Sequence, residues 1–218
     1  MSDEAPVSTG KLVLVPAVIT LGVTLLRLFG ELQGWSPRLF SREAGGGGAL
    51  VGISWLVPIF GAWFGWTIAR SGSVPRLGRA LGLTLVAFAL VPALGLAARA
   101  AGLAEVSLTT FALYVVGAIV GAVLGLRAWP ALGRTLLAYA LAARVPVALV
   151  MLLAIFGNWG THYDVPPPGL PPMGPFQKWL LIGLLPQMTI WIWFTVVVGC
   201  LFGLGAAALA RRRAAATA

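Results

Sequence analysis

Arg144 is the residue whose type and position most strongly suggest a functional role. It lies ten residues after Arg134 in an apolar segment, which corresponds to roughly 15 Å of helix rise. A charged side chain at that depth in a membrane is costly and by default indicates a functional site. No Asp or Glu occurs at a comparable depth to pair with it. Two interpretations remain open: an arginine that snorkels toward the headgroups or serves the structure, and a binding site for an anionic ligand or a lipid.

Several groups are available to surround this arginine. Pro146, two residues later, frees backbone carbonyls in its helix, and the hydroxyls of Tyr139 and Thr195 are within the apolar segments. Lipid phosphate or an anionic ligand in a wet cavity would serve equally. We therefore predict Arg144, Pro146 and Thr195 as the ligand-binding or lipid-binding residues.

A second group of polar residues precedes a run of prolines. His162, Tyr163 and Asp164 are consecutive in the segment Gly157–Gln177, and six residues of this segment are proline. Such a segment favours stiff, extended polyproline geometry rather than helix. The loop is expected to fold over the outer face of the molecule or to contact a partner, through Trp159, His162, Tyr163 and Asp164.

The chain offers little for metal binding or catalysis. His162 and Asp164 are two potential ligands, whereas zinc sites need three or four protein ligands, and the chain has one His and one Cys. Neither a phosphate-binding glycine loop ending in Lys-Ser or Lys-Thr nor an acid–base pair within the apolar segments is present. We predict no catalytic residue, no metal and no cofactor. Enzymatic activity is left open, and the residues present disfavour it.

Arg27 and Glu31 are four residues apart in the first apolar segment. This spacing places both side chains on one face of a helix, so we predict a local ion pair that lowers the cost of burying Arg27.

The elements that carry these residues follow from composition. The 218 residues are 59% hydrophobic and 10% charged, whereas a soluble domain is about a quarter charged. Six stretches reach the roughly 20 apolar residues that a spanning helix requires. They are 12–32, 50–69, 80–98, 108–126, 133–156 and 186–210. The sequence therefore predicts an all-α, polytopic membrane protein with about six transmembrane helices.

Boundaries follow from the same pattern. Residues 1–11 form an amino-terminal tail, 12–210 a single transmembrane domain, and 211–218 a basic tail. Residues 176–185 precede the last stretch, and together they exceed the thickness of a bilayer. Because Pro186 lacks an N–H, we expect a short interfacial helix over 176–185 and a kink at Pro186.

Cations predict the orientation. With six spans, nine Lys and Arg residues lie on the amino-terminal side and four on the other. The positive-inside rule then places both termini in the cytoplasm, so the net charge of +9 reflects topology and not nucleic-acid binding. The richness in Arg, Ala, Gly and Leu suggests a bacterial inner membrane protein.

Glycines recur at a spacing of four residues, which brings both onto one helix face and allows close helix packing. The pairs are Gly61 and Gly65, Gly121 and Gly125, and Gly199 and Gly203. Each belongs to a pattern of helix, basic loop and proline-containing helix, which suggests repeated hairpins packed through small-residue faces.

Two functions fit these observations. The first is a non-catalytic accessory or scaffolding subunit of a membrane complex, with the lipid bilayer and other membrane-protein subunits as partners. The second is a small transporter, channel or lipid-handling protein that uses Arg144 within proline-broken helices.

Overall fold

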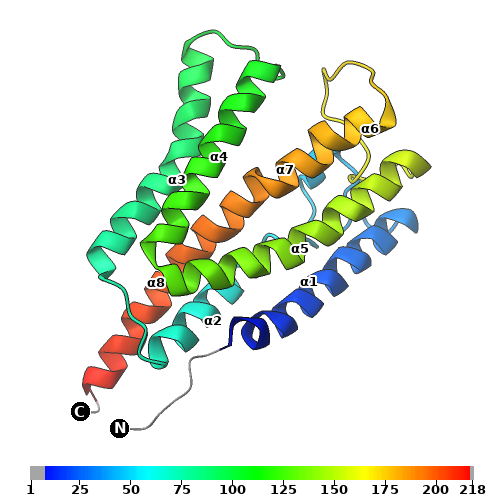
Figure 1. Ribbon diagram of the computed structural model, residues 1–218. Helices are drawn as coiled ribbons and strands as arrows, with labels where there is room; N and C mark the ends of the chain where they lie inside the picture. The colour runs from blue at the N-terminus through cyan, green and yellow to red at the C-terminus, as the bar shows by residue number, and fades with distance from the viewer. Residues whose placement is uncertain (1–7, 217–218) are drawn as a thin grey trace.

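The computed structural model describes residues 8–216, and every regular element among them is helical (Figure 1). Five stretches have the length and hydropathy to cross a membrane, which confirms an all-α, polytopic membrane protein. They are α1 (Thr9–Leu32), α3 (Leu77–Ala100), α4 (Leu108–Ala128), α5 (Pro130–Gly157) and the carboxy-terminal stretch Pro175–Arg213, which includes most of α8 (Ile190–Ala216).

The sixth expected span is shorter than predicted. Helix α2 (Leu56–Arg70) has 15 residues, which corresponds to roughly 23 Å and falls short of the ~30 Å hydrocarbon core. The stretch was expected to begin at Leu50, but the helix begins six residues later. Pro58 falls in its first turn, where a missing N–H leaves no helical hydrogen bond unmade. A count of six full spans is therefore not confirmed.

The chain between α1 and α2 is irregular where the sixth span was expected to begin. Residues 33–55 contain one short helical turn, η1 (Ala44–Gly46), and are otherwise irregular. Helix α1 runs alongside α5, whereas α2 occupies only the end at which α1 begins and α8 ends (Figure 1). The irregular segment accordingly lies beside the other half of the bundle.

The last stretch is helical across Pro186. It comprises α6 (Pro175–Lys178), a wider π-helical turn η2 (Trp179–Leu184), α7 (Leu185–Met188) and α8. Leu185 keeps helical dihedral angles, and the departure from them falls at Thr189 instead of at the proline. A proline ring collides with the carbonyl four residues earlier, and the wider turn before Pro186 accommodates it.

Helix α8 lies at the centre of the bundle and contacts α2 through paired glycines. Gly61 approaches Gly199 so closely that a Cβ on Gly61 would lie 2.6 Å from the Gly199 carbonyl oxygen. One turn later Gly65 lies against Gly203 in the same way. Any larger residue would force the two backbones apart.

The glycine pair of α4 packs against a different face of α8. A Cβ on Gly121 would lie 2.6 Å from the indole of Trp193, and one on Gly125 would lie 3.0 Å from Val196. The Trp193 indole N–H donates to the Ala87 carbonyl at 2.9 Å, so α3 is joined to the same contact.

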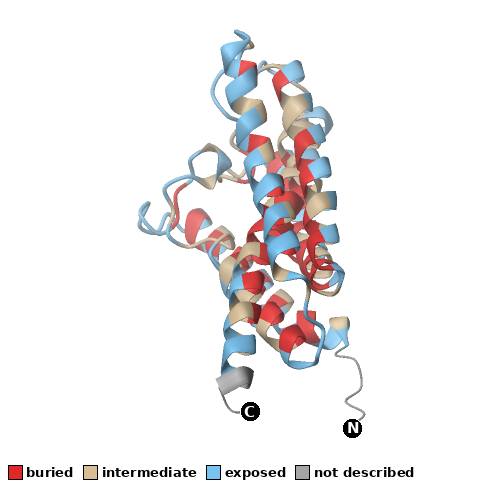
Figure 2. Cartoon of the chain, turned by 90° about the vertical axis from the view of Figure 1, so that its left-hand side faces the viewer, coloured by how far each residue is buried: buried red, intermediate tan, exposed pale blue. Residues whose placement is uncertain are grey.

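Buried residues concentrate where the helices meet, whereas the outward helix faces are exposed (Figure 2). Many of those exposed residues are large and apolar, on α1, α3 and α4 in particular. A soluble monomer rarely exposes so much apolar surface, and the lipid bilayer is the environment that suits it.

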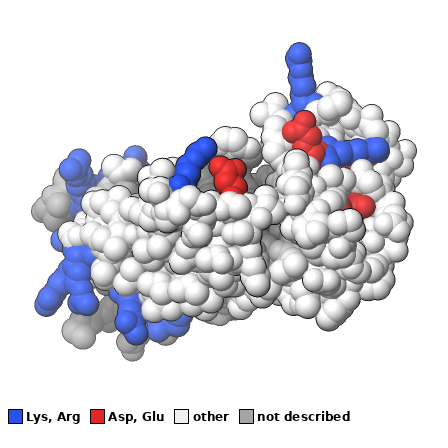
Figure 3. Space-filling view, turned by 90° about the horizontal axis from the view of Figure 1, so that it is seen from above, with Lys and Arg blue, Asp and Glu red and all other residues white. Residues whose placement is uncertain are grey.

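Charge is distributed unevenly along the bundle. Arg70, Arg127 and Arg134 lie at the end of α2, the end of α4 and the start of α5, at the end of the bundle where α1 begins (Figure 1). In the view from above, Lys and Arg gather on the left, where no Asp or Glu is visible (Figure 3). In the middle and on the right, the visible Lys or Arg side chains lie near Asp or Glu.

The expected tails lie partly outside the described residues. This applies to 1–7 and to 217–218. Helix α8 continues to Ala216, so the three consecutive arginines at 211–213 belong to the end of a helix.

Candidate functional site

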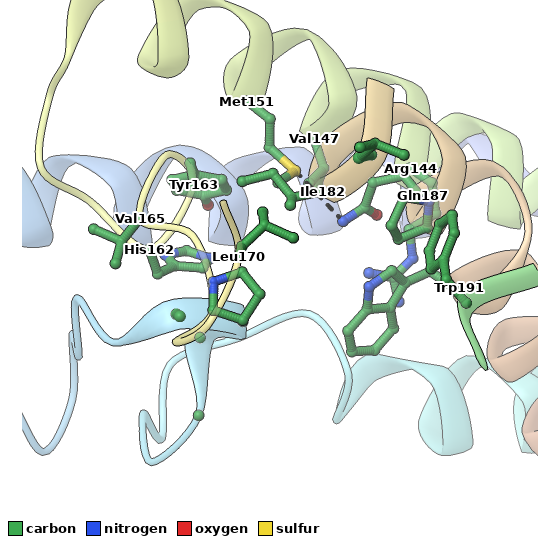
Figure 4. A pocket seen from close by; sticks show the side chains of 18 of the residues that line it. Arg144, Val147, Met151, His162, Tyr163, Val165, Leu170, Ile182, Gln187 and Trp191 are labelled. Carbon is green, nitrogen blue, oxygen red and sulfur yellow. Dashed lines mark hydrogen bonds between the residues drawn. The ribbon is translucent and has the colours of Figure 1, made fainter. Parts of the chain in front are cut away.

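A cavity of about 940 Å³ lies between α4, α5 and α7. The irregular segment before α2 and the proline-rich segment after α5 complete its wall. Figure 4 shows Arg144, Gln187 and Trp191 at one end of the cavity and His162, Tyr163 and Val165 at the other. Apolar side chains separate these two ends, among them Val147, Met151 and Ile182.

Arg144 lies at the end of this cavity that Gln187 and Trp191 also line (Figure 4). It lies in the middle of α5, is 3% exposed, and places its guanidinium carbon 4.6 Å from the centre of the Trp191 ring. Among the described residues, its Nε has no hydrogen-bond partner and no carboxylate forms an ion pair with it. Since the side chain is buried, it does not reach the surface of the molecule as a snorkelling arginine would.

The hydroxyls that could have satisfied Arg144 are engaged elsewhere. Tyr139 shares a hydrogen bond of 2.8 Å with Thr20 of α1, and Thr195 donates to the Trp191 carbonyl at 2.8 Å. Neither Thr195 nor Pro146 lines the cavity. Of the three predicted ligand-binding residues, only Arg144 faces it.

Gln187 is a polar residue of the site that the sequence analysis missed. Its amide nitrogen lies 3.8 Å from the Met151 sulfur, a weak acceptor, and its amide oxygen has no partner among the described residues. The side chain is 7% exposed and lines the cavity beside Arg144 (Figure 4). A glutamine next to Pro186 in an apolar stretch was the available signal.

Together, these two side chains form a polar end in an apolar cavity. Arg144 supplies a permanent positive charge with unused hydrogen-bonding capacity, and a glutamine amide can present either N–H donors or an oxygen acceptor. Because a buried polar group without a partner is costly, the arrangement favours a ligand that carries an anionic group.

The opposite end of the cavity is closed by a network centred on Glu31. Its carboxylate is fully buried and accepts from Arg27 Nε at 2.9 Å, which confirms the predicted ion pair. It also accepts from the His162 backbone N–H at 2.8 Å and contacts His162 Nδ1 at 2.5 Å. Residues 131 positions apart are therefore joined at one carboxylate.

The irregular segment 33–55, which contains four consecutive glycines at 45–48, contacts this network through its backbone. Arg27 donates to the carbonyls of Gly46 at 3.0 Å and Ser41 at 3.3 Å. Gly46 has φ +71°, and a Cβ there would lie 2.8 Å from both Arg27 and His162. The run of glycines at 45–48 thus packs against the buried charges through Gly46.

The residues predicted to contact a partner are directed into the molecule. Tyr163 donates to the Thr24 carbonyl at 3.2 Å and is buried. Asp164 accepts from the backbone N–H groups of Gly160 and Thr161 at 2.9 and 2.7 Å, which forms a compact turn. Trp159 packs beside them.

Burial also sets the protonation state of His162. It lowers the pKa of the imidazole from its usual 6.5, and the nearby Arg27 acts in the same direction, although Glu31 opposes both. The imidazole is therefore neutral near pH 7, and hydrogen bonding with Glu31 orients it.

Known proteins add no identification to this geometry. No family model, curated protein or solved structure matches the chain. Among the described residues, no group of three His, Cys, Asp or Glu side chains comes together as a metal site.

Proposed function

We propose that the chain is a membrane-embedded binding protein for an anionic ligand, of the transport or lipid-handling kind, with Arg144 as the residue that binds the anion. The observation that carries this proposal is the buried guanidinium with an unpartnered Nε at the end of a cavity large enough for a ligand. Ligand cavities typically span about 300–1,000 Å³ and combine apolar walls with a few polar groups, as here.

Arg144 is a buried charge that has no ion-pair partner among the described residues. A buried ion without a partner is strongly unfavourable, and a hydrogen bond to a charged group contributes about 1.5–3 kcal/mol. An anion at Arg144 would therefore be bound roughly tenfold to a hundredfold more tightly than the same molecule without that contact.

Native mass spectrometry of the protein extracted from its own membrane tests the proposal. We expect a bound anion on the wild type that is lost in Arg144→Gln. Arg134→Gln is the matched control, because this exposed arginine lies on the same helix outside the cavity. An adduct retained equally by all three proteins would contradict the role of Arg144.

An accessory role in a membrane complex is the second candidate. The prolines at 166–168 are exposed, and Phe176 at the start of the last helical stretch is 60% exposed. This rigid, partly apolar ridge supports contact with another membrane subunit, and a stoichiometric protein partner in the same mass spectrum would favour it.

For orientation we propose that both ends of the chain face the cytoplasm of a bacterium. The start of α1 and the end of α8 lie at one end of the bundle, where most Lys and Arg residues also lie (Figures 1 and 3). The positive-inside rule then directs the cavity toward the outer face of the inner membrane. A cysteine introduced at Pro167 should react with a thiol label only from the outside. A cysteine introduced at Arg127 should react only from the inside.

A further inference from the structure

We infer that the ligand of the Arg144 cavity is a monoanionic amphiphile: one carboxylate or phosphodiester group attached to a hydrocarbon body. This inference rests on the proposed function and specifies the chemical class that it leaves open.

The charges around the cavity indicate a single negative charge. Arg27 is neutralised by Glu31, and Glu105 pairs with Arg99 on the exposed surface. Arg144 remains as the one uncompensated cation among the described residues that line the cavity. A dianionic head group would therefore retain an uncompensated charge after binding, whereas a monoanion would not.

The walls indicate a hydrocarbon body. Between Arg144 and the outer end, Val147, Met151, Leu181 and Ile182 present apolar surface to the cavity. A small inorganic anion or a short carboxylate would leave this surface and most of the 940 Å³ to water. A hydrocarbon chain would cover the walls and gain about 0.8 kcal/mol for each CH₂ removed from water.

The helix arrangement provides a route from the bilayer. Helices α4 and α7 diverge toward the end of the bundle opposite the start of α1 (Figure 1), and the cavity is lined by Phe111 of α4 on one side and Pro186 of α7 on the other. Leu108 of α4 and Ile182 of η2, which also line the cavity, are apolar as well. A hydrocarbon chain can lie along these apolar lining residues while its anionic group reaches Arg144.

Binding of chosen probes to the protein in phosphatidylcholine nanodiscs tests the inference, after subtraction of binding to empty nanodiscs. The probes are radiolabelled decanoate, acetate and decyltrimethylammonium. We expect decanoate to bind saturably, one per chain, and the other two not to bind. Arg144→Gln should weaken decanoate binding at least tenfold, and Arg134→Gln should leave it unchanged.

A second variant tests the hydrocarbon part independently. Ile182→Trp fills the apolar section of the cavity and does not alter Arg144, so it should weaken decanoate binding at least tenfold. Phosphatidylglycerol added to the nanodiscs distinguishes the source. Competition with decanoate would indicate a lipid headgroup, whereas decanoate binding without competition would indicate a free fatty-acid-like anion, and either result supports a monoanionic amphiphile.

The failures are distinguishable. If acetate binds as tightly as decanoate and Ile182→Trp has no effect, the hydrocarbon inference is wrong while the anion site stands. If Arg144→Gln binds decanoate as the wild type does, or decyltrimethylammonium binds equally, the anion site itself is wrong. Absence of saturable binding by both decanoate and phosphatidylglycerol would overturn the inference.

Discussion

Replacing Glu31 with glutamine should loosen the end of the molecule at which α1 ends. The carboxylate is fully buried and contacts Arg27 Nε at 2.9 Å, the His162 N–H at 2.8 Å and His162 Nδ1 at 2.5 Å. The amide keeps the shape but removes the negative charge that compensates Arg27. Because breaking a buried ion pair costs about 3–5 kcal/mol, we expect a loss of about 3 kcal/mol or more.

Thermal unfolding in detergent, followed by circular dichroism, measures the loss. For a chain of this size each kcal/mol corresponds to roughly 2–4 °C, so the Tm should fall by roughly 6 °C or more. Hydrogen exchange supplies a local readout, because the His162 amide N–H donates directly to the carboxylate and should exchange faster in the variant.

Glu105→Gln is the matched control. It removes the same charge from an ion pair with Arg99 whose side chains are 76% and 78% exposed, and such surface pairs contribute little. Its Tm should match that of the wild type. If Glu31→Gln unfolds at the same temperature as Glu105→Gln and the His162 amide keeps its protection, the network does not hold segments 33–55 and 157–177 against α1.

Three further predictions concern packing, pH and stability. Gly65→Val should separate α2 from α8, because the new Cβ would collide with the backbone of Gly203. The free energy of unfolding, measured by chemical unfolding, should fall by about 1–3 kcal/mol or more. Gly82→Val is the control: a Cβ there would meet open space, so the loss should stay below about 1 kcal/mol. The amides of the segment around His162 should lose protection against exchange, relative to the unprotected rate at each pH, as the pH falls below about 6.5. The lowered pKa of His162 means that the undocked segment binds the proton more readily, so protection factors that stay the same from pH 7 to pH 5 would contradict this. Arg144→Met should raise the Tm of the ligand-free protein by removing a buried charge with an unpartnered Nε, and a lower Tm would show that the guanidinium stabilises the empty fold.

Much of the fold could be predicted because long apolar runs in a chain with few charges have one physical solution. Backbone groups in a bilayer must be hydrogen-bonded internally, so such runs become helices. The start of α2 was harder to predict. Hydropathy averages over residues 50–69 and does not register that the helix begins only at Leu56.

The candidate site could also be predicted only in part. The depth of Arg144 and its lack of a nearby carboxylate could be predicted from the sequence. The local pairing of Arg27 with Glu31 could be predicted as well. The long-range contact between Glu31 and His162 was not, because one sequence carries no record of which loop folds onto which helix end. Gln187 was overlooked since a lone neutral side chain produces little signal against an apolar background.

The depth of Arg144 has an electrical consequence. It has 14 residues of α5 before it and 13 after it, so an anion that reaches it from the outer face would cross about half of the membrane. A full crossing is worth about 2.3 kcal/mol per charge at 100 mV, so half of the crossing is worth about 1.2 kcal/mol. In the proposed orientation, with a negative potential on the cytoplasmic side, this energy opposes entry and weakens binding roughly sevenfold at 100 mV. The occupancy of the cavity would then fall when the membrane is energised and rise when its potential collapses.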